Sequence, residues 1–182
     1  MTRFLPLAAL VAGLAVPAAA QDASAALAQL QALADTGSFD PEDLPAVAIT
    51  AEGCVLTIAV RAVSPQLDVP LGAVSSADAR DLLPAGFTPD PTGGRMTIWI
   101  PREDQAPIDL TMTIDSDDST AREAFSAGLG ASCDATGPCT GIQAVPRMPV
   151  NFYLADGEDG MVRARAFSTA LSEFAAACTP AE

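Results

Sequence analysis

Every second residue is apolar along several stretches of this chain, and that period predicts β-strands. The clearest stretch is 108–114, where Ile, Leu, Met and Ile alternate with Asp and Thr. The same alternation runs over 54–61, with Cys54 on the apolar side, and over 96–100, with Trp99 on the polar side. Because successive side chains point to opposite faces of a strand, each of these strands has one face for a core and one for solvent.

Weaker patterns predict the other elements. Apolar residues alternate over 47–49, 150–154 and 161–166. A strand over 68–74 is confined to a sheet edge by Pro70, which has no N–H to donate. Helical spacing of apolar residues predicts helices over 23–35, 75–83, 120–130 and 168–178. Two of these helices begin with the spacing of a capping box, Ser75 with Asp78 and Thr120 with Glu123.

The order of these elements suggests a fold class. After the first helix, two strands followed by a helix occur three times, over 46–83, 95–130 and 149–178. Hairpins followed by helices favour a mainly antiparallel sheet with the helices packed on one face. The sequence therefore predicts an α+β fold built from these hairpin-plus-helix (ββα) units and stabilised by disulfides.

The first twenty residues have the features of a secretory signal peptide. Arg3 supplies a positive charge, an apolar stretch runs over 4–16, and small residues precede a cleavage point after Ala20. We therefore expect residues 1–20 to be removed and 21–182 to form one domain in the periplasm or outside the cell. The residue directly after the cleavage point is Gln21 and not a cysteine, so no lipid anchor is expected. No later apolar run reaches the roughly 18 residues that span a bilayer.

The composition is strongly acidic, with 23 acidic residues against nine arginines and a formal net charge of −14. Without Arg3 the charge is −15, from 8 minus 23. Such a surface repels nucleic acid and anionic membranes and favours solubility. The chain holds neither His nor Lys. This excludes Ser-His-Asp and Cys-His sites, Schiff-base lysines and histidine zinc ligands.

Four cysteines remain after the predicted cleavage, which in an exported chain indicates disulfides with three possible pairings. We predict Cys133–Cys139, because Gly137 and Pro138 provide a turn between them. The second predicted bridge, Cys54–Cys178, joins an early strand to the last helix. A redox pair is disfavoured, because five residues separate Cys133 from Cys139 and no His or Lys could activate a thiol. A zinc site of four cysteines is disfavoured by the oxidising compartment.

Other residues are candidates for binding. On the predicted strand 161–166, Arg163 and Arg165 share one side and could clamp a carboxylate or phosphate, or simply pair with surface acids. The acidic clusters at 115–118 and 156–160 lack the Gly and Glu of a calcium loop, so we interpret them as a helix start and a hairpin turn. Trp99 could stack on a sugar or peptide, or pack under a helix.

The sequence favours an exported, non-catalytic binding or accessory protein of a bacterial envelope. Abundant alanine with no Lys and a single Asn is typical of a GC-rich bacterial genome. The expected partner is a protein or an envelope component, and no cofactor, metal or catalytic residue is expected. One alternative is a hydrolase that uses two carboxylates, for example on glycans. The other is a carrier of small anions through Arg163 and Arg165.

Overall fold

The computed structural model describes residues 18–34, 38–39, 44–64, 66–92, 95–135, 137–154 and 157–178. The α-helices within these ranges are α1 (Ala18–Ala34), α2 (Ser119–Leu129) and α3 (Gly160–Ala177). The strands are β1 (Ser38–Phe39), β2 (Leu44–Pro45), β3 (Val47–Glu52), β4 (Val55–Val63), β5 (Pro70–Asp78), β6 (Thr88–Thr92), β7 (Arg95–Pro101), β8 (Ile108–Ile114), β9 (Ser132–Cys133), β10 (Cys139–Val145) and β11 (Arg147–Tyr153). Two 3₁₀ turns, η1 (Ala79–Asp81) and η2 (Pro84–Gly86), lie between β5 and β6.

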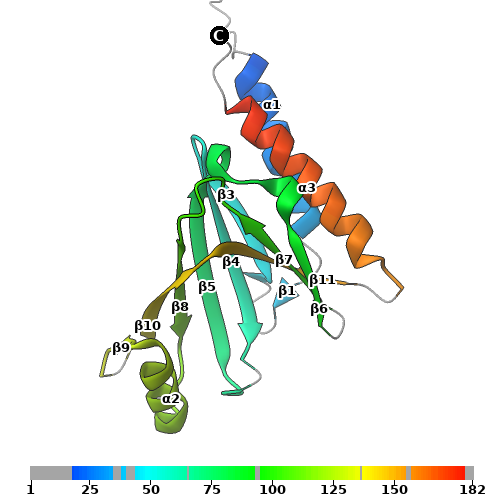
Figure 1. The fold of residues 1–182 in the computed structure, drawn as a ribbon. Helices are drawn as coiled ribbons and strands as arrows, with labels where there is room; N and C mark the ends of the chain where they lie inside the picture. Colours follow the sequence, from blue (N-terminus) through cyan, green and yellow to red (C-terminus); the bar gives the residue numbers. More distant parts are fainter. Residues whose placement is uncertain are drawn as a thin grey trace, which may run out of the picture.

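The strands form two main antiparallel sheets and a small β1-β2 pair. One sheet has the order β3-β4-β5-β8-β10-β9, and the other has the order β11-β7-β6. Only Pro146 separates β10 from β11, so the chain passes directly from one sheet into the other (Figure 1). All described strand pairs are antiparallel, and the helices accompany them as separate elements. This confirms the predicted α+β class with mainly antiparallel sheets.

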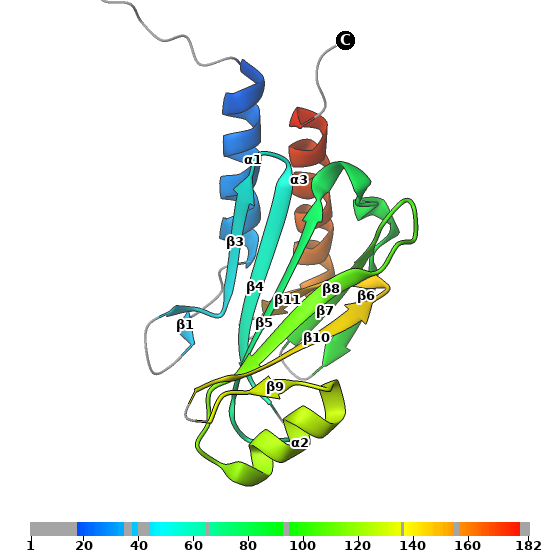
Figure 2. The same cartoon turned by 90° about the vertical axis from the view of Figure 1, so that its left-hand side faces the viewer.

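The main core lies between the two long helices and the sheets. Helices α1 and α3 lie side by side and run in opposite directions (Figure 2). The phenyl ring of Phe152 on β11 meets that of Phe167 on α3 edge to face, with 5.2 Å between ring centroids. One face of the three-stranded sheet is almost wholly apolar and buried, and it consists of Met96, Ile98, Ile100, Met148, Val150 and Phe152. The predicted face of 96–100 is confirmed.

Helix α1 also protects the free edge of β3. The side-chain amide nitrogen of Gln31 donates to the Val47 carbonyl at 3.3 Å, and its oxygen accepts from the Ile49 N–H at 2.6 Å. Both backbone groups point away from β4. An unpaired edge strand invites pairing with another chain, so Gln31 closes this edge. The buried residues of the helix, Ala26, Leu30 and Ala34, hold it in place.

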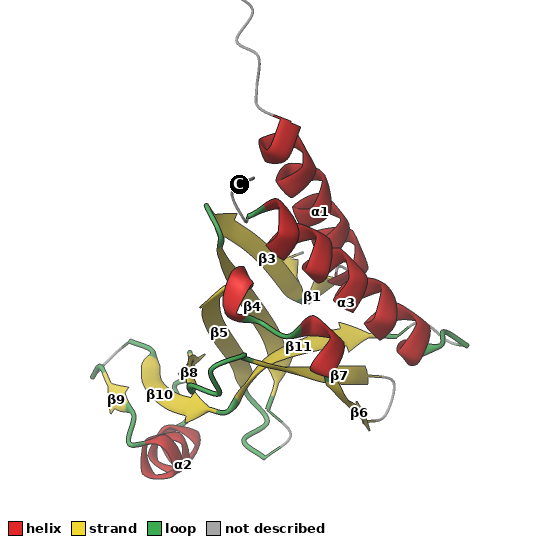
Figure 3. Ribbon diagram, turned by 45° about the horizontal axis from the view of Figure 1, so that its top comes forward, coloured by secondary structure: helices red, strands yellow, loops and turns green. Residues whose placement is uncertain are grey.

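Helix α2 packs at the far end of the molecule from α1 and α3 (Figure 3). Its Phe125 is buried with Ile114 and Cys139 in a second, smaller core. The Asp118 carboxylate accepts from two N–H groups of the first turn, at 2.8 and 3.3 Å. Asp118 is therefore the N-cap, and the predicted box of Thr120 with Glu123 is wrong. The helix ends at Gly130, whose φ of 61° suits glycine.

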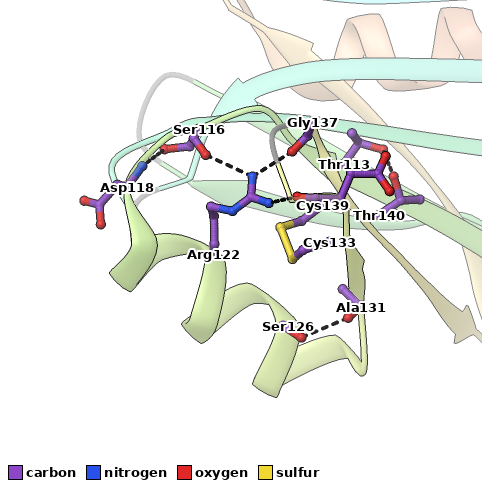
Figure 4. The surroundings of a disulfide bond; sticks show 11 residues. Thr113, Ser116, Asp118, Arg122, Ser126, Ala131, Cys133, Gly137, Cys139 and Thr140 are labelled. Carbon is purple, nitrogen blue, oxygen red and sulfur yellow. Dashed lines mark hydrogen bonds between the residues drawn. A yellow bond between two sulfur atoms is a disulfide. The ribbon is translucent and has the colours of Figure 1, made fainter.

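The disulfide Cys133–Cys139 is present, as predicted, beside this helix (Figure 4). The guanidinium of Arg122 donates to the carbonyls of Ser116 at 3.2 Å and Gly137 at 2.7 Å, and also to the Asp134 carbonyl. One arginine thus connects α2, the end of β8 and the disulfide loop. This role could not be predicted from the sequence, because the three acceptors are backbone carbonyls.

Two predicted elements are wrong. Residues 75–83 do not form a helix, because 75–78 continue β5 and pair with β4, leaving only the 3₁₀ turn η1. Strand β5 is also internal to its sheet, and Pro70 is tolerated because it is the first residue of the strand. Strand preference depends on context, so pairing with β4, and at Ser75 also with β8, overrides the helical spacing of these residues.

The segment 161–166 is likewise not a strand. It forms the first part of α3, whose N-cap Asp159 accepts from the Met161 N–H at 2.9 Å. Alanines at 164 and 166 fit either period, and Ala164 is buried on the helix face that meets the core. The expected start of the last helix at Ser168 is therefore eight residues late.

Candidate functional site

A cavity of about 280 Å³ lies between the two sheets, on the side of the three-stranded sheet that faces away from α3. Strands of both sheets contribute to its wall. Its lining residues are Ile58, Val60, Leu71, Ala73, Ser75, Asp90, Thr97, Trp99, Leu110, Met112, Pro149 and Asn151. Ligand sites typically have such a wall, mostly apolar with a few polar groups, and volumes from about 300 Å³ upward.

The six-stranded sheet supplies the apolar wall, and its register aligns the residues in rows. Ile58, Ser75 and Leu110 are direct partners across β4, β5 and β8. The next row on the same face holds Val60, Ala73 and Met112. Ser75 is the one polar side chain in these two rows.

The three-stranded sheet supplies most of the polar groups, again as a cross-strand row. Asp90, Thr97 and Asn151 are direct partners across β6, β7 and β11. The Thr97 hydroxyl donates to the Asn151 side-chain oxygen at 2.6 Å, so the Asn151 amide nitrogen keeps its two hydrogens for other acceptors. Trp99 and Pro149 form the neighbouring row. Trp99 is partly exposed and lies on the predicted Thr97 side of the strand.

The Ser75 hydroxyl is the most unusual group in this wall. The residue is only 2% exposed, yet its hydroxyl has no hydrogen-bond partner in the part of the chain that the structure describes. A buried polar group without a partner costs about 1–3 kcal/mol. Because Ser75 lines the cavity, a bound molecule or water is the natural partner for this hydroxyl.

The carboxylates of the cavity bear on the hydrolase alternative. Asp90 is its only carboxylate among the described lining residues, and it is exposed to solvent. Hydrolysis of a glycoside by two carboxylates requires a second one about 5–10 Å away. The cavity therefore offers shape, apolar surface and a few hydrogen bonds, without the pair of acids that the hydrolase alternative requires.

The structure does not bring Arg163 and Arg165 together. Both lie on α3, where residues two apart point in nearly opposite directions. Arg163 pairs with Glu158 at 3.1 Å and is largely buried, whereas Arg165 is exposed. The shared side predicted for them depended on a strand that does not form. The structure therefore does not place the two guanidinium groups side by side, as binding of one anion by both would require.

The cluster at 115–118 is a helix start, as interpreted, but the cluster at 156–160 does not turn a hairpin, because α3 follows it directly. Asp118 caps α2, and Asp159 caps α3. Residue 156 of the second cluster lies outside the described part of the chain, as do residues 1–17 of the predicted signal peptide. Within the described ranges, no three metal-binding side chains come together.

The structure brings Cys54 and Cys178 into contact but shows both as free thiols. The Cys54 thiol lies 3.6 Å from the Cys178 carbonyl oxygen, within hydrogen-bond distance for sulfur. Burial, together with a hydrogen bond from Cys54, raises the pKa of the Cys178 thiol from 9.0 to about 12. The two residues are 124 positions apart in the chain, and contact between them is what the predicted second bridge requires.

Comparisons with known proteins add no functional information: no protein-family model, curated protein or solved structure matches this chain. Among the described helices, none combines the length and the apolarity that crossing a bilayer requires.

Proposed function

We propose that this protein is an exported, non-catalytic binding protein that holds a small molecule in the cavity between its two sheets. The observation that carries the proposal is the buried Ser75 hydroxyl, which lies in an otherwise apolar wall and has no hydrogen-bond partner among the described residues. Apolar surface gives such a site its affinity, and the few polar groups orient the ligand.

This proposal is narrower than the one drawn from the sequence, which favoured a protein or envelope component as partner. A cavity of about 280 Å³ suits a small molecule or one side group of a larger one. It is enclosed by two sheets rather than spread over a flat surface. Its geometry therefore favours a small ligand as the first partner to test.

Export is part of the same proposal and has two kinds of support. The Cys133–Cys139 disulfide is typical of proteins from oxidising compartments. Ala26, Leu30 and Ala34, the buried residues of α1 among those whose burial is described, all follow the predicted cleavage point and therefore remain after removal of residues 1–20. N-terminal sequencing of the protein from a periplasmic extract should find Gln21 first. An N-terminus at Met1 would contradict export by this signal.

The binding proposal can be tested with N-phenyl-1-naphthylamine, a neutral apolar dye that fluoresces in apolar sites. Trp99 is the only tryptophan of the chain, so energy transfer from it reports dye at this cavity. We expect saturable binding to the wild-type protein. The variant Ala73→Phe should bind at least tenfold more weakly, because its ring fills the cavity from β5.

Val74→Phe is the matched control, because Val74 is the next residue of the same strand and is 40% exposed on the opposite face. It should bind the dye as the wild type does. Circular dichroism and the melting temperature check that both variants fold. Absence of dye binding to the wild type, or equal binding to a folded Ala73→Phe variant, would overturn the proposal.

A further inference from the structure

The polar groups of the cavity are unevenly distributed, and this restricts the ligand. One wall is apolar apart from Ser75, and the other carries the row of Asp90, Thr97 and Asn151. A ligand that satisfies both walls has an apolar body and one polar end. The row of Asp90, Thr97 and Asn151 determines where the polar end of the ligand lies, which is beside Asp90 at the open side of the cavity.

The charge of the cavity selects the kind of polar end. Among the described lining residues, Asp90 alone is charged. The nearby Arg147 is not part of the lining, and its guanidinium donates to the Thr88 hydroxyl at 2.6 Å. The chain as a whole carries a formal charge of −14. Both the local carboxylate and the overall field attract a cation and repel an anion.

The groups around Asp90 also favour a ligand with a cationic polar end. A carboxylate accepts hydrogen bonds only, which suits the N–H donors of an ammonium group, and the Ser75 hydroxyl in the opposite wall can also accept a hydrogen bond. Trp99, in the row next to Asp90, presents an aromatic ring, and aromatic faces attract cations.

We infer that the cavity takes a small monoamine, protonated at its polar end, with an aromatic or alkyl body that packs between Trp99 and the Leu110–Met112 wall. This inference rests on the proposed function and deepens it by naming the ligand class. It excludes the small anions that the sequence suggested.

Three compounds with the same ring and similar length test the inference: 2-phenylethylamine, 2-phenylethanol and 3-phenylpropanoate. We expect the amine to bind about five times more tightly than the alcohol, as for an exposed ion pair. It should bind about 20 times more tightly than the carboxylate, which Asp90 repels. Trp99 fluorescence or calorimetry on the intact protein measures each dissociation constant.

Variants then locate the effect. Asp90→Asn should reduce the affinity for the amine to that for the alcohol. Asp109→Asn removes the same charge from the exposed, opposite face of β8 and should leave the preference unchanged. Equal affinities for all three compounds, or the same loss in both variants, would overturn the amine assignment. Dye binding by Asp90→Asn distinguishes this failure from failure of the proposed function, which predicts that the dye still binds.

An independent observation concerns the two remaining cysteines. We propose that Cys54 and Cys178 form a second disulfide in the oxidising compartment. The thiol of Cys54, directly before β4, already reaches the C-terminal cap of α3, where Cys178 lies. The bridge would join the β3-β4 hairpin to α3 across the main core.

The chemistry requires an oxidant, for which the disulfide of a thiol oxidoreductase or glutathione disulfide suffices. One cysteine loses its proton, attacks the carrier disulfide and releases one carrier thiol. The second cysteine then attacks the mixed disulfide and releases the other. The two protein thiols lose two electrons, and the carrier disulfide is reduced to two thiols.

Mass spectrometry of protein from the periplasm tests this proposal. The protein is unfolded in iodoacetamide without reductant and digested. We expect no alkylated cysteine, a linked pair of peptides that contain Cys54 and Cys178, and an intact mass about 4 Da below that of the reduced chain. In Cys178→Ser, Cys54 should become alkylated. Alkylation of both residues in wild-type protein, even after treatment with glutathione disulfide, would contradict the proposal.

Discussion

Replacement of Cys54 by serine should destabilise the oxidised protein more than replacement of Cys133. The loop closed by Cys54 and Cys178 spans 124 positions, whereas the loop of the Cys133–Cys139 bridge spans six. A bridge stabilises mainly by restricting the unfolded chain, and the restriction grows with loop length. The entropy model gives about 5 kcal/mol for the long loop and about 2 kcal/mol for the short one.

Urea unfolding under oxidising conditions measures both effects. Cys54→Ser should lower the free energy of unfolding by about 5 kcal/mol, and Cys133→Ser by about 2 kcal/mol. Cys133 is exposed, so serine at that position removes little besides the bridge. In the presence of a reductant, the effect of Cys54→Ser should fall below about 1 kcal/mol, because no bridge remains to be lost. The reasoning is refuted if Cys133→Ser is the more destabilising change, or if the reductant leaves the effect of Cys54→Ser unchanged.

Three further predictions follow from individual contacts. Gln31→Ala should lower the free energy of unfolding by about 1–3 kcal/mol, because two edge groups of β3 lose their partner; an unchanged urea midpoint would contradict the edge role. The Arg80 guanidinium, together with the Arg80 backbone N–H, lowers the pKa of Asp78 from 3.8 to about 2; Arg80→Ala keeps the N–H, so NMR titration of this variant should find the pKa raised but still below 3.8. Because the pKa of Asp78 is depressed in the folded protein, the Asp78–Arg80 pair stabilises the protein above pH 3.8, and this stabilisation is lost as the pH falls toward 2. If Arg80→Ala and the wild type lose stability in acid equally, the pair does not stabilise the protein. Gly141→Ala places a Cβ 3.1 Å from that of Ala131 and should lower the melting temperature by several degrees, whereas no change would show that α2 shifts freely.

The sequence predicted those elements whose pattern has one clear period. β7 and β8 alternate strictly, and their faces were assigned correctly. The helix over 23–35 was found, although it begins at Ala18. The short disulfide was predictable because its two cysteines are close in the chain and a turn lies between them.

The errors fall where residue types are neutral and distant contacts decide. Ser75 and its neighbours could cap a helix or continue a strand, and only pairing of β5 with both β4 and β8 settles the choice. The first turns of α3 are rich in alanine, which fits both periods. For β5 the deciding partner strands lie more than ten residues away in the chain.

The candidate site was predictable only in part. The side of the strand that carries Trp99 followed from alternation, but its neighbours Asp90 and Asn151 follow from the register of three strands. Ser75 could not be recognised at all, because its burial depends on the sheet opposite. A site whose residues lie in rows across several strands can be recognised only when the strand order is known.

Selective isotope labelling tests the central claim most directly. The chain contains one tryptophan and one asparagine, Trp99 and Asn151, and both line the cavity. The Trp99 indole N–H and the Asn151 side-chain amide therefore each give a signal from a single residue in suitably ¹⁵N-labelled protein. During titration with 2-phenylethylamine, both signals should move and saturate with one dissociation constant. If the amine binds and both signals stay in place, or if no binding occurs while the dye also fails to bind, the cavity is not the ligand site.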